Sequence, residues 1–421
     1  MKRYRHALEW LVAAALAVTV FAFAAGSSIE YHVLFYARTY RWVCLFVLLG
    51  LALLCAAASG SGSRNRLPWG FLVLAAGLIG LTLASAAWSV DASLTLRRAG
   101  SLAVLFAIAA ALLVVSPRRV LMGLLAGAVA VGIAGLGTLA LDHDAAVQPA
   151  STQYPARFQG FEQNPDTAAL LFALAIPIAV YLLLTARTLV ARLILAAALL
   201  LFAGSITASG ARGPMLGALV GTLLVVAATA GGRRLVLAGL TIAVFAACLG
   251  ISRIPQAKPV PPSSSNVPTI RRTLFTSSGR RAAWAGAIHQ AEDRPVAGYG
   301  FGTEALVFVD RYAGFDSDLV ENSYIGAVLQ LGIAGLVLLV ALGVAAFGPF
   351  ARAPARGAQA AFAGAAAAAL VVAITQSYLF SVGNIGTATA WISLFLVASQ
   401  RAPAASSEMT ASREIATSHS G

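Results

Sequence analysis

Four charged residues in the polar connections of a very apolar chain are the first candidates for chemistry: Arg157, Arg212, Arg280 and Glu321. A guanidinium forms paired hydrogen bonds with phosphate oxygens, so arginines held at a membrane surface predict an anion site there. A carboxylate partly withdrawn from water can take a proton from a hydroxyl. Because these residues are far apart in the sequence, the elements between them must bring them together.

Each of these residues also has a purely structural interpretation. Arg157 and Arg212 could extend along the membrane interface or pair with nearby carboxylates. Asn164 or Asp166 could cap the helix that follows. Glu321 stands at the start of an apolar run, where a carboxylate favours a helix without any catalytic role. The residue pattern leaves both interpretations open.

The chain as a whole is too apolar to fold as a water-soluble globule. Of its 421 residues, 59% are hydrophobic and 11% are charged, whereas soluble domains carry about 25% charged residues. The mean hydropathy is +0.83. The apolar blocks are rich in Ala, Leu, Val and Gly and lack alternating polarity, which favours helices over a β-barrel. We therefore expect an all-α integral membrane protein.

Apolar runs of about 17 to 25 residues predict about twelve transmembrane helices. They lie near residues 8–26, 42–58, 70–88, 99–115, 120–141, 167–186, 191–208, 213–230, 235–251, 323–347, 359–379 and 385–399. The first run could instead be a signal peptide cleaved after Ala24, but we favour an uncleaved helix. In the eighth run, Gly213, Gly217 and Gly221 predict a helix-packing face.

The connections alternate between basic and acidic, which orients the helices by the positive-inside rule. With the N-terminus in the cytoplasm, the cytoplasmic segments carry the paired arginines near positions 64, 118, 187, 233 and 352, and nearly all carboxylates face outward. Both termini are then cytoplasmic. The net charge of +13 does not indicate a nucleic-acid partner, because it is divided between the two sides of the membrane.

A long, partly helical outer loop separates the ninth and tenth predicted helices. The expected organisation is helices one to nine in 1–251, the loop in 252–322, helices ten to twelve in 323–400 and a cytoplasmic tail in 401–421. Residues 255–268 are rich in Pro and Ser and predict an extended lead. Residues 279–293 predict an amphipathic helix that ends at Pro295. The glycines 298, 300 and 302 predict a turn whose backbone can approach a ligand.

Nothing in the pattern predicts a metal or another cofactor. The five histidines are scattered, and Cys44, Cys55 and Cys248 all fall within apolar blocks. Asp316 and Asp318 form an isolated match to a metal-binding carboxylate pair, which is weak evidence. His289 is a second possible base, although a lone histidine is more often a surface or packing residue.

Four motifs in order resemble the O-antigen ligase and polymerase superfamily of bacterial membrane glycosyltransferases. They are Arg157, Gly160 and Asn164-Pro165-Asp166 entering a helix; Thr207-Ala-Ser209-Gly-Ala-Arg212-Gly213; Gly279-Arg280 with Trp284, followed by Pro295, Gly298 and Gly300; and Glu321-Asn322-Ser323-Tyr324, followed by Leu331-Gly332-Ile333-Ala334-Gly335. The resemblance covers about residues 150–345. Ligases of the family usually carry histidine at the position of Glu321, so this departure favours a polymerase or a ligase with another acceptor.

The resemblance implies metal-independent, inverting transfer of a glycan from undecaprenyl diphosphate to an acceptor hydroxyl, at the periplasmic face of the bacterial inner membrane. The acceptor is the lipid A–core of lipopolysaccharide or another glycan; an O-antigen or exopolysaccharide polymerase and a protein O-oligosaccharyltransferase are the alternatives. The implied catalytic residues are Glu321, Arg212 and Arg280, and the implied substrate-binding residues are Arg157, Arg281, Asn322, Tyr324 and Asn164.

Two alternatives come from other classes of protein. A polysaccharide or lipid transporter also needs many helices, but transporters place ionisable residues and helix breaks near mid-membrane. Here most charges gather in the connections. A structural scaffold for cell-envelope assembly is the third possibility, and product formation by the purified protein would reject it.

Overall fold

The computed structural model describes residues 2–27, 31–58, 67–150, 156–161, 164–251, 280–308, 317–352 and 357–399. Its long apolar helices are α1 (Lys2–Ala25), α2 (Tyr31–Ala57), α3 (Trp69–Ala84), α4 (Ala92–Ala111), α5 (Pro117–Leu141), α7 (Pro165–Thr185), α8 (Leu189–Ser209), α9 (Arg212–Thr229), α10 (Arg234–Ile251), α13 (Ser323–Arg352), α14 (Ala358–Val372) and α15 (Ile385–Ala398). The shorter elements are η2 (Ser85–Ala87), η3 (Leu112–Val114), α6 (His143–Ala146), β1 (Val147–Gln148), β2 (Arg157–Phe158), η4 (Gly231–Arg233), α11 (Arg280–Ala291) and α12 (Glu304–Val307).

The prediction of an all-α, multi-pass membrane protein is confirmed. Within the described residues, nine helices are long and apolar enough to cross a membrane, and three shorter apolar helices lie at 235–248, 358–372 and 385–398. The count of twelve crossings stays a prediction, because the three shorter helices fall below the usual length. The predicted amphipathic helix is α11, whereas the predicted extended lead and the tail lie outside the described residues.

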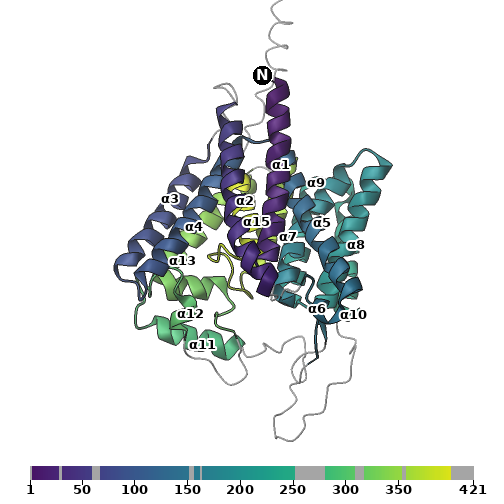
Figure 1. Ribbon diagram of the computed structural model, residues 1–421. Helices are drawn as coiled ribbons and strands as arrows, with labels where there is room; N and C mark the ends of the chain where they lie inside the picture. The colour runs from purple at the N-terminus through teal and green to yellow at the C-terminus, as the bar shows by residue number, and fades with distance from the viewer. Residues whose placement is uncertain are drawn as a thin grey trace, which may run out of the picture.

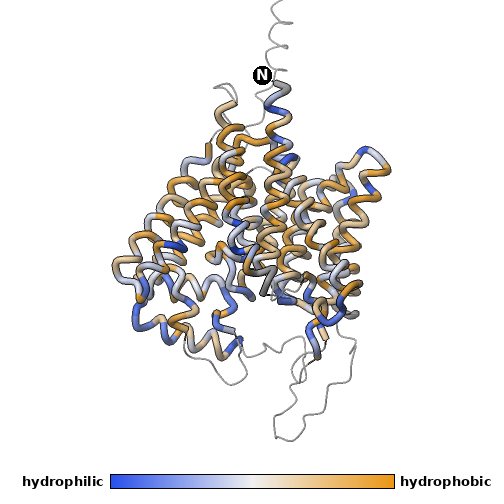
Figure 2. The backbone as a smooth tube through the Cα atoms, viewed as in Figure 1, coloured by the Kyte–Doolittle hydropathy of each residue, from blue (hydrophilic) through white to orange (hydrophobic). Residues whose placement is uncertain are grey.

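The helices stand side by side, and five short elements, α6, β1, β2, α11 and α12, gather at the end of the bundle opposite the N-terminus (Figure 1). This end, called the polar end below, contains α6, α11, α12, the β1–β2 pair and residues 317–322. Hydrophobic residues dominate along the bundle, and hydrophilic residues become frequent at the polar end (Figure 2). Large apolar side chains such as Trp69, Leu193 and Leu200 are exposed on the sides, as expected for surfaces that face lipid.

The glycines of α9 pack this helix directly against α14. A Cβ atom on Gly217 would lie 2.8 Å from the carbonyl oxygen of Ala368, and one on Gly221 would collide with the carbonyl of Gly364. The predicted small-residue packing face is therefore confirmed. Because this contact fixes α9, it also fixes Arg212, the first residue of the helix, at the polar end.

Helix α13 is broken at Gly332, which has φ 64° and ψ −165°. The break lies against the segment that follows α11: the backbone N–H of Ile333 donates to the carbonyl of Pro295 at 2.8 Å, and that of Gly300 donates to the carbonyl of Gln330 at 2.9 Å. The first part of α13, residues 323–331, is thereby held at the polar end.

The glycine run approaches the protein's own chain. Gly298, Gly300 and Gly302 all have positive φ, and Cβ atoms on them would collide with the backbone of Gln330, with Ser89 and with the side chain of Arg98. The space that these glycines leave is filled by α13, α4 and the connection before α4, and the predicted approach of this turn to a ligand is untested.

We predict that Gly332→Ala lowers the thermal unfolding midpoint of the purified protein by several degrees. An alanine resists the left-handed conformation, and its Cβ would overlap the carbonyl group of Val296. The matched control is Gly343→Ala in the same helix, where nothing lies within 4 Å of an added Cβ. That variant should melt at or above the wild-type temperature; equal midpoints for the two variants would contradict the packing described.

Candidate active site at the polar end

Three connections meet at the carboxylate of Asp166, in the first turn of α7. The Nη2 group of Arg157 donates to its Oδ1 at 2.7 Å, and the Nη2 atom of Arg280 lies 3.8 Å from its Oδ2. The Nε group of Arg157 also donates to the carbonyl of Ser209 at 2.7 Å. The segments before α7, after α8 and at the start of α11 are thus joined by charge-assisted contacts.

The buried Arg157 side chain works as an internal tie. Its side chain is only 6% exposed, and its guanidinium donates to the carboxylate of Asp166 and to the carbonyl of Ser209. The β1–β2 pair holds it in place, because Arg157 is paired with Gln148 in the antiparallel register. The structure therefore favours the ion-pair interpretation of Arg157; direct contact with a substrate stays a prediction.

Asn164 caps α7. Its side-chain oxygen accepts from the backbone N–H of Asp166 at 2.9 Å, and Pro165 occupies the first turn, where a missing N–H costs nothing. The capping interpretation is confirmed, and it explains how Asp166 is aimed at the arginines. The exposed Asn164 lies beside them, and its predicted role in substrate binding is untested.

Arg212 follows a turn of only two residues. Helix α8 ends at Ser209, Gly210 takes the left-handed conformation with φ 63°, and α9 begins at Arg212. The partly buried Arg212 therefore starts a helix next to the carbonyl that Arg157 binds. The structure brings Arg157, Arg212 and Arg280 to the same end of the bundle, as the sequence predicted.

Glu321 has an unusual backbone and an unusual carboxyl group. It is the one non-glycine residue with positive φ in the described part of the chain, at 56°. Its Oε1 accepts from the hydroxyl of Ser317 at 2.9 Å. Burial raises the pKa of Glu321 to about 7, while the positive charge of Arg280 and the Ser317 hydrogen bond oppose the rise and the charge of Asp166 adds to it. This places a group with the pKa of a general base beside Arg280.

Asn322 and Tyr324, two predicted substrate-binding residues, use their polar atoms inside the protein. The Oδ1 atom of Asn322 accepts from the backbone N–H groups of Tyr324 and Ile325 at 2.9 and 3.1 Å, so it caps α13. The hydroxyl of Tyr324 donates to the carbonyl of Leu370 at 2.8 Å. Both residues hold the start of α13 in place, and their contact with a substrate is untested.

Helix α11 presents its two remaining candidates to the outside. Arg281 is exposed, and His289 is exposed and contacts Glu292 at 3.0 Å. The same helix reaches the segment before Glu321 on its other side, where Trp284 Nε1 donates to the carbonyl of Val320 at 3.0 Å. The charge of Arg280 lowers the pKa of Glu321, whereas His289 is not one of the groups that shift it.

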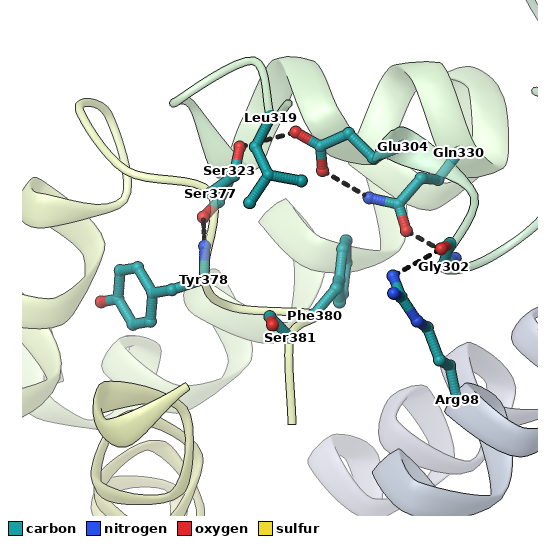
Figure 3. Close-up of a pocket in the computed structure, with 10 residues that line it drawn as sticks. All are labelled: Arg98, Gly302, Glu304, Leu319, Ser323, Gln330, Ser377, Tyr378, Phe380 and Ser381. Carbon is teal, nitrogen blue, oxygen red and sulfur yellow. Dashed lines mark hydrogen bonds between the residues drawn. The ribbon is translucent and has the colours of Figure 1, made fainter. Parts of the chain in front are cut away.

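Glu304 is a polar residue at the site that the sequence patterns did not single out. It is 5% exposed, in α12, and its carboxylate accepts from the backbone N–H of Val320. The same carboxylate accepts from the Ser377 hydroxyl and the Gln330 amide (Figure 3). Burial raises its pKa, against the effect of these hydrogen bonds and of Arg98. A carboxylate within the apolar stretch from Phe301 to Phe308 was the available signal.

A small cavity lies beside Glu304. Its lining, drawn in Figure 3, consists of Arg98, Gly302, Glu304, Leu319, Ser323, Gln330, Ser377, Tyr378, Phe380 and Ser381. At about 30 Å³ it has room for one or two water molecules and none for a sugar ring. The described residues include no group of three or more His, Cys, Asp or Glu side chains that could hold a metal ion; Asp316 lies outside them.

Comparison with known families gives one match. Residues 196–340 match the model of the O-antigen ligase family. This match supports the resemblance of the chain to the O-antigen ligase and polymerase superfamily. The matched segment runs from within α8 into α13 and contains Arg212, Arg280 and Glu321, whereas Arg157 and Asp166 precede it. The match implies a membrane glycosyltransferase-type enzyme acting on glycan or lipid-linked substrates. No curated protein matches the chain.

We predict that Asp166→Asn destabilises the protein by roughly 1–3 kcal/mol, because it leaves the buried Arg157 guanidinium without its counter-charge. Unfolding in detergent, followed by heat or denaturant, measures the loss. The control is Asp144→Asn, since Asp144 is fully exposed in its contact with His143 and should contribute nothing measurable. Indistinguishable unfolding of the two variants would show that the ion pair between Arg157 and Asp166 does not stabilise the protein.

Proposed function

We propose that this protein is an O-antigen ligase-like glycosyltransferase. It moves a glycan from undecaprenyl diphosphate to an acceptor hydroxyl, with the lipid A–core of lipopolysaccharide as the first acceptor to test. The polar end of the bundle then faces the periplasm of a bacterial inner membrane, and both termini face the cytoplasm. The observation that carries the proposal is the charged cluster at the polar end, where Arg157 and Arg280 share the carboxylate of Asp166 and burial raises the pKa of Glu321 to about 7.

Glu321 is the proposed base. Its carboxylate takes the proton of the acceptor hydroxyl while the hydroxyl oxygen bonds to the anomeric carbon of the donor glycan. The bond between that carbon and the diphosphate oxygen breaks, and its electron pair leaves with undecaprenyl diphosphate. A single displacement of this kind inverts the anomeric centre. A base is most effective when its pKa lies near the working pH, which matches Glu321.

The arginines are the proposed site for the leaving diphosphate. Two guanidinium groups, of Arg157 and Arg280, share the single carboxylate of Asp166, so the cluster keeps one excess positive charge. Arg157 is the more tightly held, at 2.7 Å against 3.8 Å, which leaves Arg280 as the group that turns to a phosphate. Arg212 joins it from the start of α9. Fixed cations at the outer face stabilise the charge that grows on the diphosphate without a metal ion.

The same chemistry serves the alternatives within the superfamily. A polymerase passes the glycan to a second lipid-linked glycan, and a protein O-oligosaccharyltransferase passes it to a serine or threonine. Glutamate in place of the histidine usual in ligases favours these alternatives. The identity of the acceptor separates them, so each acceptor is one arm of the assay.

The test uses purified protein in liposomes with an undecaprenyl-diphosphate-linked glycan, and with lipid A–core or a second lipid-linked glycan as acceptor. We predict release of undecaprenyl diphosphate with formation of the elongated product, and a loss of at least about 100-fold in kcat for Glu321→Gln, Arg212→Gln and Arg280→Gln. Arg97→Gln is the control, because the Arg97 side chain is exposed and donates to the carbonyl of Ser93 in its own helix. Wild-type rates in the three site variants would reject these roles, and transport without product would favour a transporter.

The pH dependence gives a separate prediction. Glu321 must be ionised to accept a proton, so kcat rises through about pH 7 and levels off above it. Because the charge of Arg280 lowers the pKa of Glu321, Arg280→Gln moves this rise to higher pH in the residual activity. Arg97→Gln should retain the wild-type profile. A flat profile between about pH 5 and 9 would contradict the assignment of Glu321 as the base.

A further inference from the structure

The left-handed backbone of Glu321 must be held by its neighbours. A residue with a Cβ atom is strained in this conformation and persists in it only where surrounding contacts impose it. The Ser317 hydroxyl donates to the Glu321 carboxylate at 2.9 Å, and Trp284 of α11 donates to the carbonyl of Val320 at 3.0 Å. The residues on either side of Glu321 share one further contact.

One oxygen of Glu304 holds the chain on both sides of Glu321. On the preceding side, Oε1 of Glu304 accepts from the backbone N–H of Val320 at 2.9 Å. On the following side, the hydroxyl of Ser377 donates to the same Oε1 at 2.8 Å. That hydroxyl in turn accepts from the backbone N–H of Asn322 at 3.1 Å. Glu304 Oε1 therefore bonds to the residue before Glu321 directly and to the residue after it through the Ser377 hydroxyl.

The other oxygen of Glu304 is fixed to the rest of the bundle. Its Oε2 accepts from Nε2 of Gln330 at 2.9 Å, and Oε1 of Gln330 accepts from the backbone N–H of Gly302 at 2.7 Å. The carbonyl of Gly302 accepts from Arg98 of α4 (Figure 3). Gly326 makes the room, since a Cβ there would lie 2.8 Å from Oε2. Every partner of this carboxylate is a donor, which suits its ionised form.

We propose that Glu304 is a positioning residue that sets the direction of the Glu321 carboxylate toward Arg280. The proposal rests on the proposed function of Glu321 as the base. Glu304 does not touch the substrate itself, because it is 5% exposed and the cavity beside it admits only water. Its loss releases the backbone N–H groups of Val320 and Asn322, on either side of Glu321, so the base turns away from the acceptor hydroxyl while the arginines keep their places.

The experiment compares Glu304→Ala with a double exchange, Glu304→Gln with Gln330→Glu. In the exchanged pair, the amide oxygen at 304 can still accept from Val320 and Ser377, its NH₂ group can donate to position 330, and the carboxylate at 330 can still accept from Gly302. Glu304→Ala should lower kcat roughly 10- to 100-fold with the donor KM within about threefold of wild type, because position and not donor binding is lost. The exchanged pair should recover kcat to within about fivefold.

A structural readout separates positioning from loss of folded protein. Hydrogen exchange of the peptide covering residues 317–324 should quicken in Glu304→Ala and return toward wild type in the exchanged pair. Ser377→Ala, which breaks only the Asn322 side, provides a milder variant if Glu304→Ala fails to fold. It should show a smaller fall in kcat and faster exchange in the same peptide.

Unchanged kcat in both Glu304→Ala and Ser377→Ala would overturn the proposal, and so would an exchanged pair that stays as inactive as Glu304→Ala. Glu321→Gln distinguishes this failure from failure of the proposed function. If Glu321→Gln is inactive while Glu304→Ala is normal, only the positioning role is wrong. If Glu321→Gln transfers glycan at the wild-type rate, the role of Glu321 is wrong and the positioning role falls with it.

Discussion

The ion pair between Arg157 and Asp166 is the contact on which the polar end depends. A buried guanidinium needs a counter-charge, and Asp166 supplies it at 2.7 Å while Ser209 accepts the second donor. These contacts tie the connection before α7 to the end of α8. Since the same carboxylate faces Arg280 at 3.8 Å, the tie also sets where α11 begins.

Neutral hydrogen bonds complete the assembly from the other half of the chain. Gln376, in the connection between α14 and α15, forms hydrogen bonds with two other segments. Its backbone carbonyl accepts from the Ser323 hydroxyl at 2.7 Å, and its side-chain amide donates to the carbonyl of Asp166 at 2.9 Å. The start of α13, and with it Glu321, is thereby linked to the residue that organises the arginines. The arginines around Asp166 and the proposed base Glu321 therefore belong to one hydrogen-bonded network.

The sequence predicted the helices and the end of the bundle where the charges gather, because apolar runs and alternating basic connections are local signals. It also placed Arg157, Arg212, Arg280 and Glu321 at one end. The separate role of each polar residue, in binding, ion pairing or helix capping, could not be predicted. Whether Arg157 faces a ligand or Asp166, and whether Asn322 binds a glycan or caps a helix, is decided by partners distant in sequence. Glu304 was missed for the same reason, since its partners come from three other segments.

The most direct test of the central claim is an infrared titration of the Glu321 carboxyl group, obtained as the difference between wild-type protein and Glu321→Gln. We predict a midpoint near pH 7, moved upward in Arg280→Gln because a nearby positive charge is removed. A midpoint at the ordinary glutamate value of about 4.3, unchanged by Arg280→Gln, would contradict the claim that these two side chains form one desolvated site.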